Sequence, residues 1–511
     1  MIPAWLKTLQ EEPVLRSLAD TLRSARGAVY LVGGVLRDAA LKRARPVVDV
    51  DLAVAGTAST SAKGLARRIA RRVGGSCFVL HEATQVYRIV PRAGASGAGD
   101  IGYQIDVAQI QGRDIAEDLA RRDFTVNAMA APLPIGSGEL LDPFNGLADL
   151  RRRLLRATSE RVLKEDPLRL LRAFRLAAQL GLRLEGRTLD WIRTHRRRLK
   201  ASAPERIRAE LMDLLSVPES APWIRKLDDA GLLTVIFDEL EKSRPCAEVY
   251  YGKGGVLKHS IAAVERLDFL LAELERVYPG LAEPLSATLD AALGGRERHK
   301  ALLRLAALLH DVAKPPCARR IDGRLRFFGH EARGAEMVAA ILRRLRFTRE
   351  EIDWLSTIVA HHLRPGNLAA NKIITDKAVF RFFRDLGPRG PDLLLLCWAD
   401  HASYLSQPSL RAVLKHVTAD PHTFRHSCVR SPETRKTLYH LQTISLLMDR
   451  YFHRPETVRP KRLVDGRDVM RALNISAGPR VGEVLRSIQE AQAEGSIKSR
   501  RDALLFLASH Y

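Results

Sequence analysis

Leu31-Val-Gly-Gly-Val-Leu-Arg37-Asp38, followed by Val48-Asp-Val-Asp-Leu52, decides the fold of this chain. Successive side chains of a β-strand point to opposite faces, so Asp49 and Asp51 face the same way. They would offer two carboxylates as hard oxygen ligands for Mg²⁺. Asp-x-Asp alone is common in loops, and Gly-Gly alone is a turn. The combination is the informative feature.

The run before the glycines, residues 28–32, predicts a buried strand. It ends at Gly33 and Gly34, where backbone amides can approach a phosphate without an intervening Cβ. Arg37, about one helical turn further on, can add a charge-assisted contact. Paired carboxylates beside a phosphate-binding turn are what two-metal phosphoryl transfer requires.

These motifs resemble the head-domain signature of the class II nucleotidyltransferases of the polymerase β superfamily, in which Gly-Gly-x-x-Arg-Asp precedes the catalytic Asp-x-Asp. That family includes CCA-adding tRNA nucleotidyltransferases and bacterial poly(A) polymerases. The resemblance implies an α+β fold: a polymerase β-like head with a mixed sheet, then an all-helical neck and body. It also implies Mg²⁺ as cofactor, CTP and ATP as substrates, and the 3′ end and acceptor arm of tRNA as partner.

Composition agrees with a polyanionic partner. The 511 residues carry a formal charge of +23, and the sequence pI is about 10.2, which favours nucleic acid or an anionic surface. We expect no membrane span, because the apolar run 393–398 is far shorter than a bilayer requires. Five scattered cysteines without Cys-x-x-Cys spacing, and an N-terminus unlike a signal peptide, indicate reduced thiols and a cytoplasmic protein.

The chain divides into four predicted parts. Residues 1–150 mix strand-like and helical segments and form the nucleotidyltransferase head. Residues 151–245 are predicted as a helical neck and body with nucleotide-selecting and RNA-binding elements. Residues 255–405 form a second helical block with seven of the 15 histidines. Residues 406–511 are expected to hold a basic linker (about 407–461) and a C-terminal helical tail.

A second motif runs from Glu117 to Met129 and contains Arg-Arg-Asp-Phe-Thr-Val-Asn-Ala. From its residues alone it is equally an amphipathic helix with a solvated charge cluster. By resemblance to the family, Arg122 contacts the incoming nucleotide, Asp123 helps to arrange the catalytic site, and Asn127 holds the local backbone or the ribose. Upstream, residues 103–107 predict a strand on which Asp106 is a candidate third carboxylate.

The third motif, residues 165–175, predicts a helix with Pro167 in its first turn. Its polar stripe can bind a base edge and phosphates, or Asp166 can be an N-cap and the arginines a solvated face. The run resembles the family's Glu-Asp-x-x-Arg motif. That resemblance implies that Asp166 and Arg169 pair with the base of CTP or ATP, and that Arg172 and Arg175 are further nucleotide contacts.

The histidine-rich block has the order of an HD-type phosphohydrolase: His259, His310-Asp311 and Asp400. Imidazole nitrogens and carboxylate oxygens together suit a divalent ion such as Mg, Mn, Ni or Co. We expect His330 and, from the pair at 361–362, His361 as additional ligands. A degenerate HD fold kept as a spacer is the alternative. The resemblance to HD-fused tRNA nucleotidyltransferases implies phosphatase or 2′,3′-cyclic phosphodiesterase activity on RNA ends.

The final region, residues 463–485, resembles the tRNA-binding tail of HD-fused family members, and Gly478-Pro479 predicts a turn that opens a helix. A helix–turn–helix packing element fits these residues equally well. Residues 75–90 depart from the strand sequence usual in enzymes that add the full triplet, so addition of only C or only A stays open.

We therefore predict an enzyme, a tRNA nucleotidyltransferase that adds CCA or part of it. A poly(A) polymerase is the first alternative, and a non-catalytic RNA-binding protein with a metal-binding HD domain is the alternative of another class. An alarmone synthetase–hydrolase combines the same chemistries, but with the HD domain first. Oligomeric state cannot be read from the sequence.

Overall fold

The computed structural model describes residues 3–23, 29–43, 49–56, 61–92, 103–136, 138–294, 297–370, 374–417 and 431–511. The chain forms two compact units. The first comprises residues 1–202 and 230–232, and the second comprises residues 203–229 and 233–511. The boundary at Ser202 therefore falls inside the range 151–245 that we predicted as neck and body.

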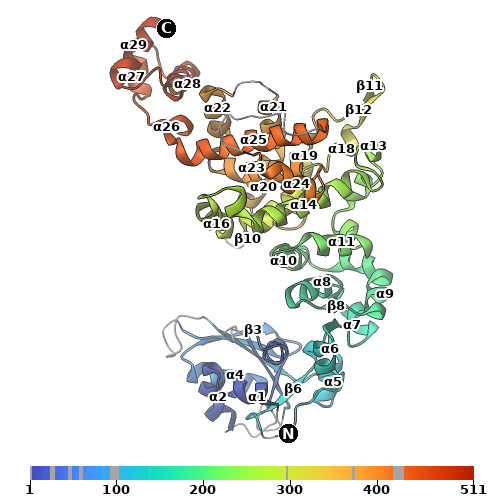
Figure 1. Ribbon diagram of the computed structural model, residues 1–511. Coiled ribbons are helices and arrows are strands. Elements are labelled where there is room, and N and C mark those ends of the chain that lie inside the picture. The colour runs from blue at the N-terminus through green and yellow to red at the C-terminus, as the bar shows by residue number, and fades with distance from the viewer. Residues whose placement is uncertain are drawn as a thin grey trace. The chain divides into compact units, whose positions relative to one another are not determined.

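The first unit is built on a six-stranded mixed sheet of order β3-β4-β5-β2-β1-β6 (Figure 1). β2 pairs in parallel with β5, and the other pairings are antiparallel. The strands are β1 (Val29–Val32), β2 (Asp49–Val54), β3 (Ser76–His81), β4 (Val86–Val90), β5 (Gln104–Gln109) and β6 (Ala130–Leu133). Helix α4 (Ala62–Arg72) packs on β3, β4 and β5. This arrangement confirms the predicted α+β head.

Further helices of the same unit lie between β5 and β6 or follow β6 in the chain. They include α5 (Ile115–Ala120), α6 (Gly146–Arg151), α7 (Glu160–Glu165), α8 (Arg169–Leu180), α9 (Gly186–His195) and the 3₁₀ turn η2 (Arg196–Ala201). In α8 the apolar side chains, among them Leu170, Leu171 and Phe174, are buried on one face while the arginines stay partly exposed. The predicted helix with a polar stripe is confirmed. It begins at Arg169, however, so Pro167 lies two residues before it and not in its first turn.

The second unit is helical. Its core is α23 (Gly390–Ala402), which packs on α14 (Gly255–Ala272), α17 (His299–Leu309) and α25 (Pro432–His453). The leucines of α23 are fully buried. Helices α19 (His330–Arg344) and α20 (Arg349–His361) pack on each other beside this core. A small hairpin of β11 (Arg319–Ile321) and β12 (Arg324–Arg326) precedes α19.

The range that we expected to be a basic linker, about 407–461, is largely helical where the structure describes it. It contains α24 (Gln407–Leu414) and the 22-residue α25. Leu438, Leu441 and Leu447 of α25 are fully buried. Ile444, which lies between them, is also fully buried, so this helix belongs to the hydrophobic core rather than to a solvated linker.

The C-terminal helices α27 (Gly466–Leu473), α28 (Pro479–Ala493) and α29 (Arg500–His510) enclose their own apolar cluster. Glu490 of α28 binds Arg381 of α22 (Asp376–Leu386) at 2.6 Å and 2.7 Å, and Lys377 lies 3.3 Å from it. Helix α28 begins at Pro479, directly after the predicted turn. No helix among the described residues is both long and apolar enough to cross a membrane.

The placement of α25 predicts the outcome of a simple substitution. Leu441→Ala should lower the free energy of unfolding by ~2–5 kcal/mol, because it leaves a cavity in a packed core. Lys436→Ala, at an exposed position of the same helix, should change it by less than ~0.5 kcal/mol. Chemical denaturation of both variants measures the difference. If Leu441→Ala lowered the free energy of unfolding no more than the control does, the assignment of α25 to the core would be wrong.

Candidate active site and metal centre

Three carboxylates lie on one face of the head sheet. Asp51 of β2 is opposite Asp106 of β5 in the parallel register, and Asp106 is opposite Arg88 of β4. Asp49 lies two residues before Asp51 and therefore points to the same face. It accepts a hydrogen bond from Gln104 Nε2 at 2.6 Å. The alternation predicted from Asp-x-Asp is thus present, on a strand whose intervening Val50 is buried.

The charges around Asp51 are unbalanced. Burial raises the pKa of Asp51 to about 6; the Arg122 guanidinium opposes this, and Asp106 and Asp49 add to it. Asp106 is itself engaged by Arg88, which donates to both of its oxygens at 2.8 Å and 2.7 Å. A buried carboxylate that is costly to ionise, next to two others, suits a divalent cation.

The glycine turn fits against these carboxylates. Gly33 has φ +81°, and a Cβ built on it would lie 2.7 Å from Asp51 Oδ2 and 3.4 Å from Arg122 Nη1. Any larger residue would therefore strain the backbone and collide with the carboxylate. Helix α3 (Gly34–Ala40) begins at the next residue. The turn consequently brings its backbone, Asp51 and Arg122 together at one place.

A hydrogen-bonded chain connects α3 with α8. Arg37 Nη1 donates to Asn127 Oδ1 at 2.7 Å, and Asn127 Nδ2 donates to Asp123 Oδ1 at 3.0 Å. Asp123 Oδ2 lies 3.4 Å from Arg172 Nη1. Arg37 also binds its neighbour Asp38 through two nitrogens. Through these contacts Arg37, Asn127 and Asp123 hold one another and Arg172 in place.

Two arginines instead keep a buried donor without a partner. The Nε atoms of Arg122 and Arg169 are buried and have no hydrogen-bond acceptor among the described residues. Burial lowers the pKa of Arg169, while Asp123 and Asp166 raise it in part. Buried donors are normally satisfied, so these two point to an acceptor supplied by a ligand.

Asp166 occupies the corner between α7 and α8. Its Oδ1 accepts the backbone N–H of Leu168 at 3.2 Å, and α8 begins only at Arg169. The residue is therefore a local turn-former rather than the N-cap proper of α8, whose N-cap position is Leu168. Arg169 Nη1 donates to the carbonyl of Val162, and Arg175 donates to Gln179.

In the second unit, six side chains converge with their ligand atoms toward one another. Four histidines and Asp311 form two groups of three that share Asp311. The sixth side chain is that of Asp400, whose Oδ1 lies 3.0 Å from His259 Nε2. One Nε2 or one carboxylate oxygen from each is buried without a hydrogen-bond partner among the described residues. They are His259, His310, Asp311, His330, His362 and Asp400.

The opposite ring nitrogens fix the imidazole tautomers. Nδ1 of His310, His330 and His362 lies 2.7–2.9 Å from a backbone carbonyl oxygen, which can only accept. His259 Nδ1 lies 3.1 Å from Ser403 Oγ, whose own hydrogen goes to the Asp400 carbonyl. Each Nδ1 therefore donates, and each Nε2 presents a lone pair to the cluster.

Asp311 is shared by two ligand groups. Its Oδ2 lies 3.4 Å from His259 Nε2 and 3.3 Å from His310 Nε2. Its Oδ1 lies 3.4 Å from His330 Nε2 and 3.7 Å from His362 Nε2. One carboxylate oxygen for each group is the arrangement that would hold two metal ions with Asp311 as a bridge.

The expectation that His361 is a ligand differs from the structure, which brings its neighbour His362 into the cluster. His361 is the last residue of α20 and lies outside both groups of ligand atoms. The side chain of His362, one residue later, points toward Asp311, with Nε2 3.7 Å from Asp311 Oδ1. The doubled histidine was visible in the sequence, but which of the two faces inward depends on where the helix ends.

Sequence reasoning also missed Arg88, Tyr251 and Lys314. Lys314 donates to Asp311 and, at 2.8 Å, to Tyr251 Oη. Burial alone would lower the pKa of Lys314, but Asp311 and Tyr251 raise it above its usual value. Tyr251 stacks on His259 with ring centroids 4.5 Å apart. Lys314 follows Asp311 by three residues on the same turn, which was the available signal.

Comparison with known proteins identifies three parts of the chain. Residues 29–156 match the poly(A) polymerase head domain, residues 181–243 the probable RNA- and SrmB-binding site of polymerase A, and residues 257–405 the HD domain. An A-adding tRNA nucleotidyltransferase of Deinococcus radiodurans is 33% identical over 93% of this chain and 94% of its own length. A CC-adding tRNA nucleotidyltransferase of Thermus thermophilus is 33% identical over 94% of this chain and 92% of its own.

Among solved structures, the Thermotoga maritima CCA-adding enzyme complexed with tRNA is similar with a TM-score of 0.62 at 18% identity, covering 99% of this chain and 98% of that one. This likeness shows a shared fold. The fold and the carboxylate site define a nucleotidyltransferase with a fused HD domain. The chain belongs to the tRNA nucleotidyltransferase family, and is an enzyme of that class.

The contact at Gly33 yields a prediction. Gly33→Ala should reduce nucleotide addition by ~100-fold or more, because the new Cβ displaces the Asp51 carboxylate and small misplacements are that costly. Gly186→Ala is the matched control, since a Cβ there meets nothing within 4 Å. Incorporation of labelled CTP and ATP into tRNA measures both. Equal activity of the two variants would contradict the close approach of the turn to Asp51.

The histidine pair yields a second prediction. His362→Ala should lower the amount of divalent metal retained by the full chain after loading with Mn²⁺, because one ligand of the Asp311 Oδ1 group is removed. His361→Ala should retain the wild-type amount. Elemental analysis after gel filtration compares the two. An equal loss in both variants, or a loss only in His361→Ala, would show that the ligand set is misassigned.

Proposed function

We propose that this enzyme adds nucleotides of the CCA triplet to tRNA 3′ ends, taking CTP and ATP as substrates. The observation that carries the proposal is the set of carboxylates on β2 and β5 next to the Gly33 turn. The named relatives support this choice, because those that match nearly the whole chain are A-adding and CC-adding tRNA nucleotidyltransferases.

We propose Asp49 and Asp51 as the ligands of Mg²⁺ in the head, with Asp106 beside them. When bound, the ions would stabilise developing charge on the phosphoryl oxygens and favour ionisation of the tRNA 3′-hydroxyl. Arg122, with its unpaired Nε next to the Gly33–Gly34 turn, would hold the triphosphate. Arg37 would act through Asn127, to which it already donates.

Selection of the base is assigned to Asp166 and Arg169. Arg169 offers a buried guanidinium with an unused Nε, and Asp166 offers a carboxylate of which one oxygen accepts from the turn. Together they present a donor and an acceptor edge, which suits the Watson–Crick edge of cytosine or adenine. Arg172 and Arg175 continue down the same face of α8 and would contact the nucleotide further out.

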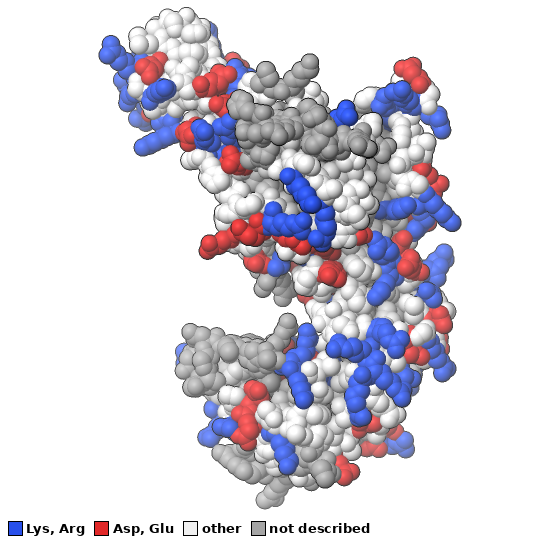
Figure 2. All heavy atoms as spheres, in the orientation of Figure 1, with Lys and Arg blue, Asp and Glu red and all other residues white. Residues whose placement is uncertain are grey.

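The tRNA would be held by basic side chains beyond α8. Figure 2 shows lysine and arginine residues gathered over the helices that follow the head. The exposed ones on β8 (Arg183–Leu184), α9 and η2 are Arg183, Arg187, Arg193, Arg197, Arg198 and Lys200. Because such contacts neutralise phosphates, tRNA affinity should fall steeply with salt. We assign the activity to the cytoplasm, where the thiols of Cys77, Cys246, Cys317 and Cys397, which form no disulfide, remain reduced.

For the second unit we propose a metal-dependent phosphohydrolase that acts on the phosphorylated ends of RNA, using Mg, Mn, Ni or Co. The proposal rests on the six convergent ligand atoms and the fixed tautomers of the four histidines. Bound metal would supply an activated water for attack on phosphorus. Lys314, held beside Asp311 by Tyr251, would neutralise the phosphate.

One assay determines which nucleotides of the CCA triplet this enzyme adds. tRNA ending at the discriminator base, at the first C or at CC is incubated with CTP, ATP or both, and the products are sized on a sequencing gel. Extension restricted to positions of CCA is the expected result. Long adenylate tails on any of the three substrates would instead identify a poly(A) polymerase, and no incorporation would refute the assignment.

The assignment of the base-selecting pair predicts the behaviour of Asp166→Asn. Asparagine keeps an acceptor for the Leu168 N–H, so folding should be preserved. The loss of one acceptor edge should erode discrimination against UTP and GTP, which such sites enforce by up to ~10⁴-fold. Glu139→Gln, which removes one charge at an exposed position of the same unit, is the control. If Asp166→Asn kept the wild-type nucleotide preference and rate, Asp166 would have only the structural role of accepting the Leu168 N–H in the turn.

A further inference from the structure

A large pocket opens next to the metal-ligand cluster of the second unit. Its volume is about 1160 Å³, and His330 and Tyr251 belong to its lining. Through these residues it borders the cluster, since His330 is one of the six convergent side chains and Tyr251 stacks on His259. Pockets for small molecules typically measure ~300–1,000 Å³. There is therefore room for more than the phosphate that the cluster itself would hold.

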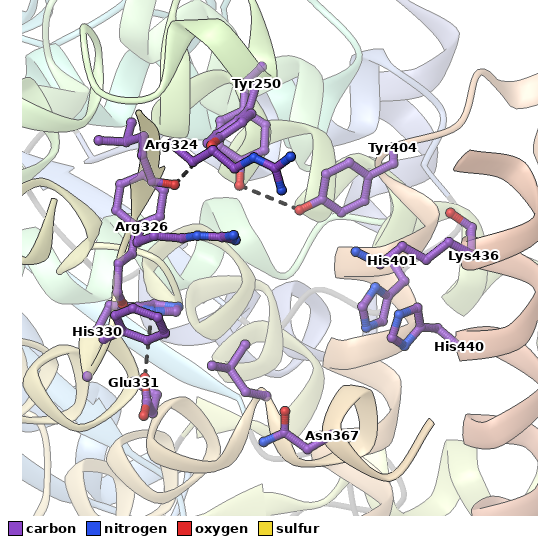
Figure 3. A pocket seen from close by; sticks show the side chains of 17 residues that line it. Tyr250, Arg324, Arg326, His330, Glu331, Asn367, His401, Tyr404, Lys436 and His440 are labelled. Carbon is purple, nitrogen blue, oxygen red and sulfur yellow. Dashed lines mark hydrogen bonds and ion pairs between the residues drawn. The ribbon is translucent and has the colours of Figure 1, made fainter. Parts of the chain in front are cut away.

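The charge of the pocket is positive. Arg324 and Arg326 on β12 and Lys436 on α25 line it and are exposed. Figure 3 shows the two arginines pointing into the pocket from one side, with Tyr404, His401 and Lys436 on the other. Among the described residues, none of the three cations has an ion pair that would neutralise it. Glu331, the acidic residue of the lining, lies 3.6 Å from His330 Nδ1.

Aromatic side chains are also concentrated here. Tyr250, Phe328 and Tyr404 line the pocket although they are 51%, 76% and 52% exposed. Tyr250 is held in place by its hydroxyl, which donates to the carbonyl of Leu325 at 2.9 Å. Exposed rings combined with unpaired cations are the usual means of binding single-stranded nucleic acid, since every base can stack and every phosphate is an anion.

We propose that this pocket binds the end of a single-stranded RNA. A phosphate beyond the one at the metal ligands would lie on Arg324 and Arg326, and a base would stack on Phe328. The proposal rests on the proposed phosphohydrolase activity for the position of the terminal phosphate. It adds that the preferred substrate is an oligonucleotide rather than a free nucleotide, because a mononucleotide ending in one phosphate has none left for the arginines.

The test uses the full chain loaded with Mn²⁺ and three probes: a fluorescent trinucleotide with a 3′-phosphate, a nucleoside 3′-monophosphate and p-nitrophenyl phosphate. Arg324→Ala/Arg326→Ala should weaken trinucleotide binding about tenfold or more, as expected for lost charged hydrogen bonds. Binding of the mononucleotide and turnover of p-nitrophenyl phosphate should stay within about twofold. Anisotropy and competition give the affinities.

Arg319→Ala/Arg320→Ala is the matched control, because it removes the same charge from the other strand of the same hairpin, whose residues do not line the pocket. It should bind the trinucleotide almost as the wild type does. Phe328→Ala should also weaken trinucleotide binding, and Phe328→Tyr should restore it.

Equal weakening in both double variants, or no weakening in either, would overturn the pocket assignment. A wild type that hydrolyses none of the probes while the two double variants still differ in trinucleotide affinity would refute the phosphohydrolase and support the RNA-end pocket.

Discussion

The parallel pairing of β2 with β5 is the constraint on which the nucleotidyltransferase site depends. Its register sets Asp51 opposite Asp106 and places Asp49 on the same face. Burial, with a contribution from Asp106 and Asp49, raises the pKa of Asp51 to about 6, so its ionisation costs free energy. Nearby positive charge reduces this cost: Arg88 engages Asp106, and Arg122 lies next to Asp51. A divalent cation would remove the remainder.

The second site also buries polar groups that could bind a metal, and most of them are imidazoles. Its four imidazoles are buried, yet each Nδ1 has a hydrogen-bond acceptor and each Nε2 has none among the described residues. Backbone carbonyls three residues earlier in the chain provide three of the four acceptors, so the tautomers follow from the fold itself. The two sites lie in separate compact units and share no described side chain, which makes two independent chemistries on one chain physically reasonable.

Much of this was predictable, because it depends on local periodicity. The two-residue period of a strand gives the Asp49–Asp51 pair, whereas the α+β head was predicted from the resemblance of this segment to the class II nucleotidyltransferases. The contact between Asp123 and Arg172 was not predictable, because it joins residues far apart in the chain. His362 replaced His361 because one residue turns a helix by about 100°. The basic composition around 407–461 concealed the buried leucines of α25.

The pocket beside the metal ligands was likewise beyond sequence reasoning, since its lining comes from β12, α25 and the segments around Tyr250 and Tyr404. The stretch from Arg324 to Glu331 contributes eight of the lining residues, and the other segments contribute two or three each. Only the fold brings the unpaired arginines and the exposed rings together. The role of Tyr251 likewise appears only in the structure, where its ring stacks on His259.

The central claim is that the β2 carboxylates carry catalysis while basic side chains elsewhere carry affinity for tRNA. Single-turnover addition and tRNA binding, measured together for Asp49→Ala and Asp51→Ala in Mg²⁺, test it most directly. The account predicts that both variants lose nucleotide addition and bind tRNA as the wild type does. Near-normal addition by either variant would contradict it.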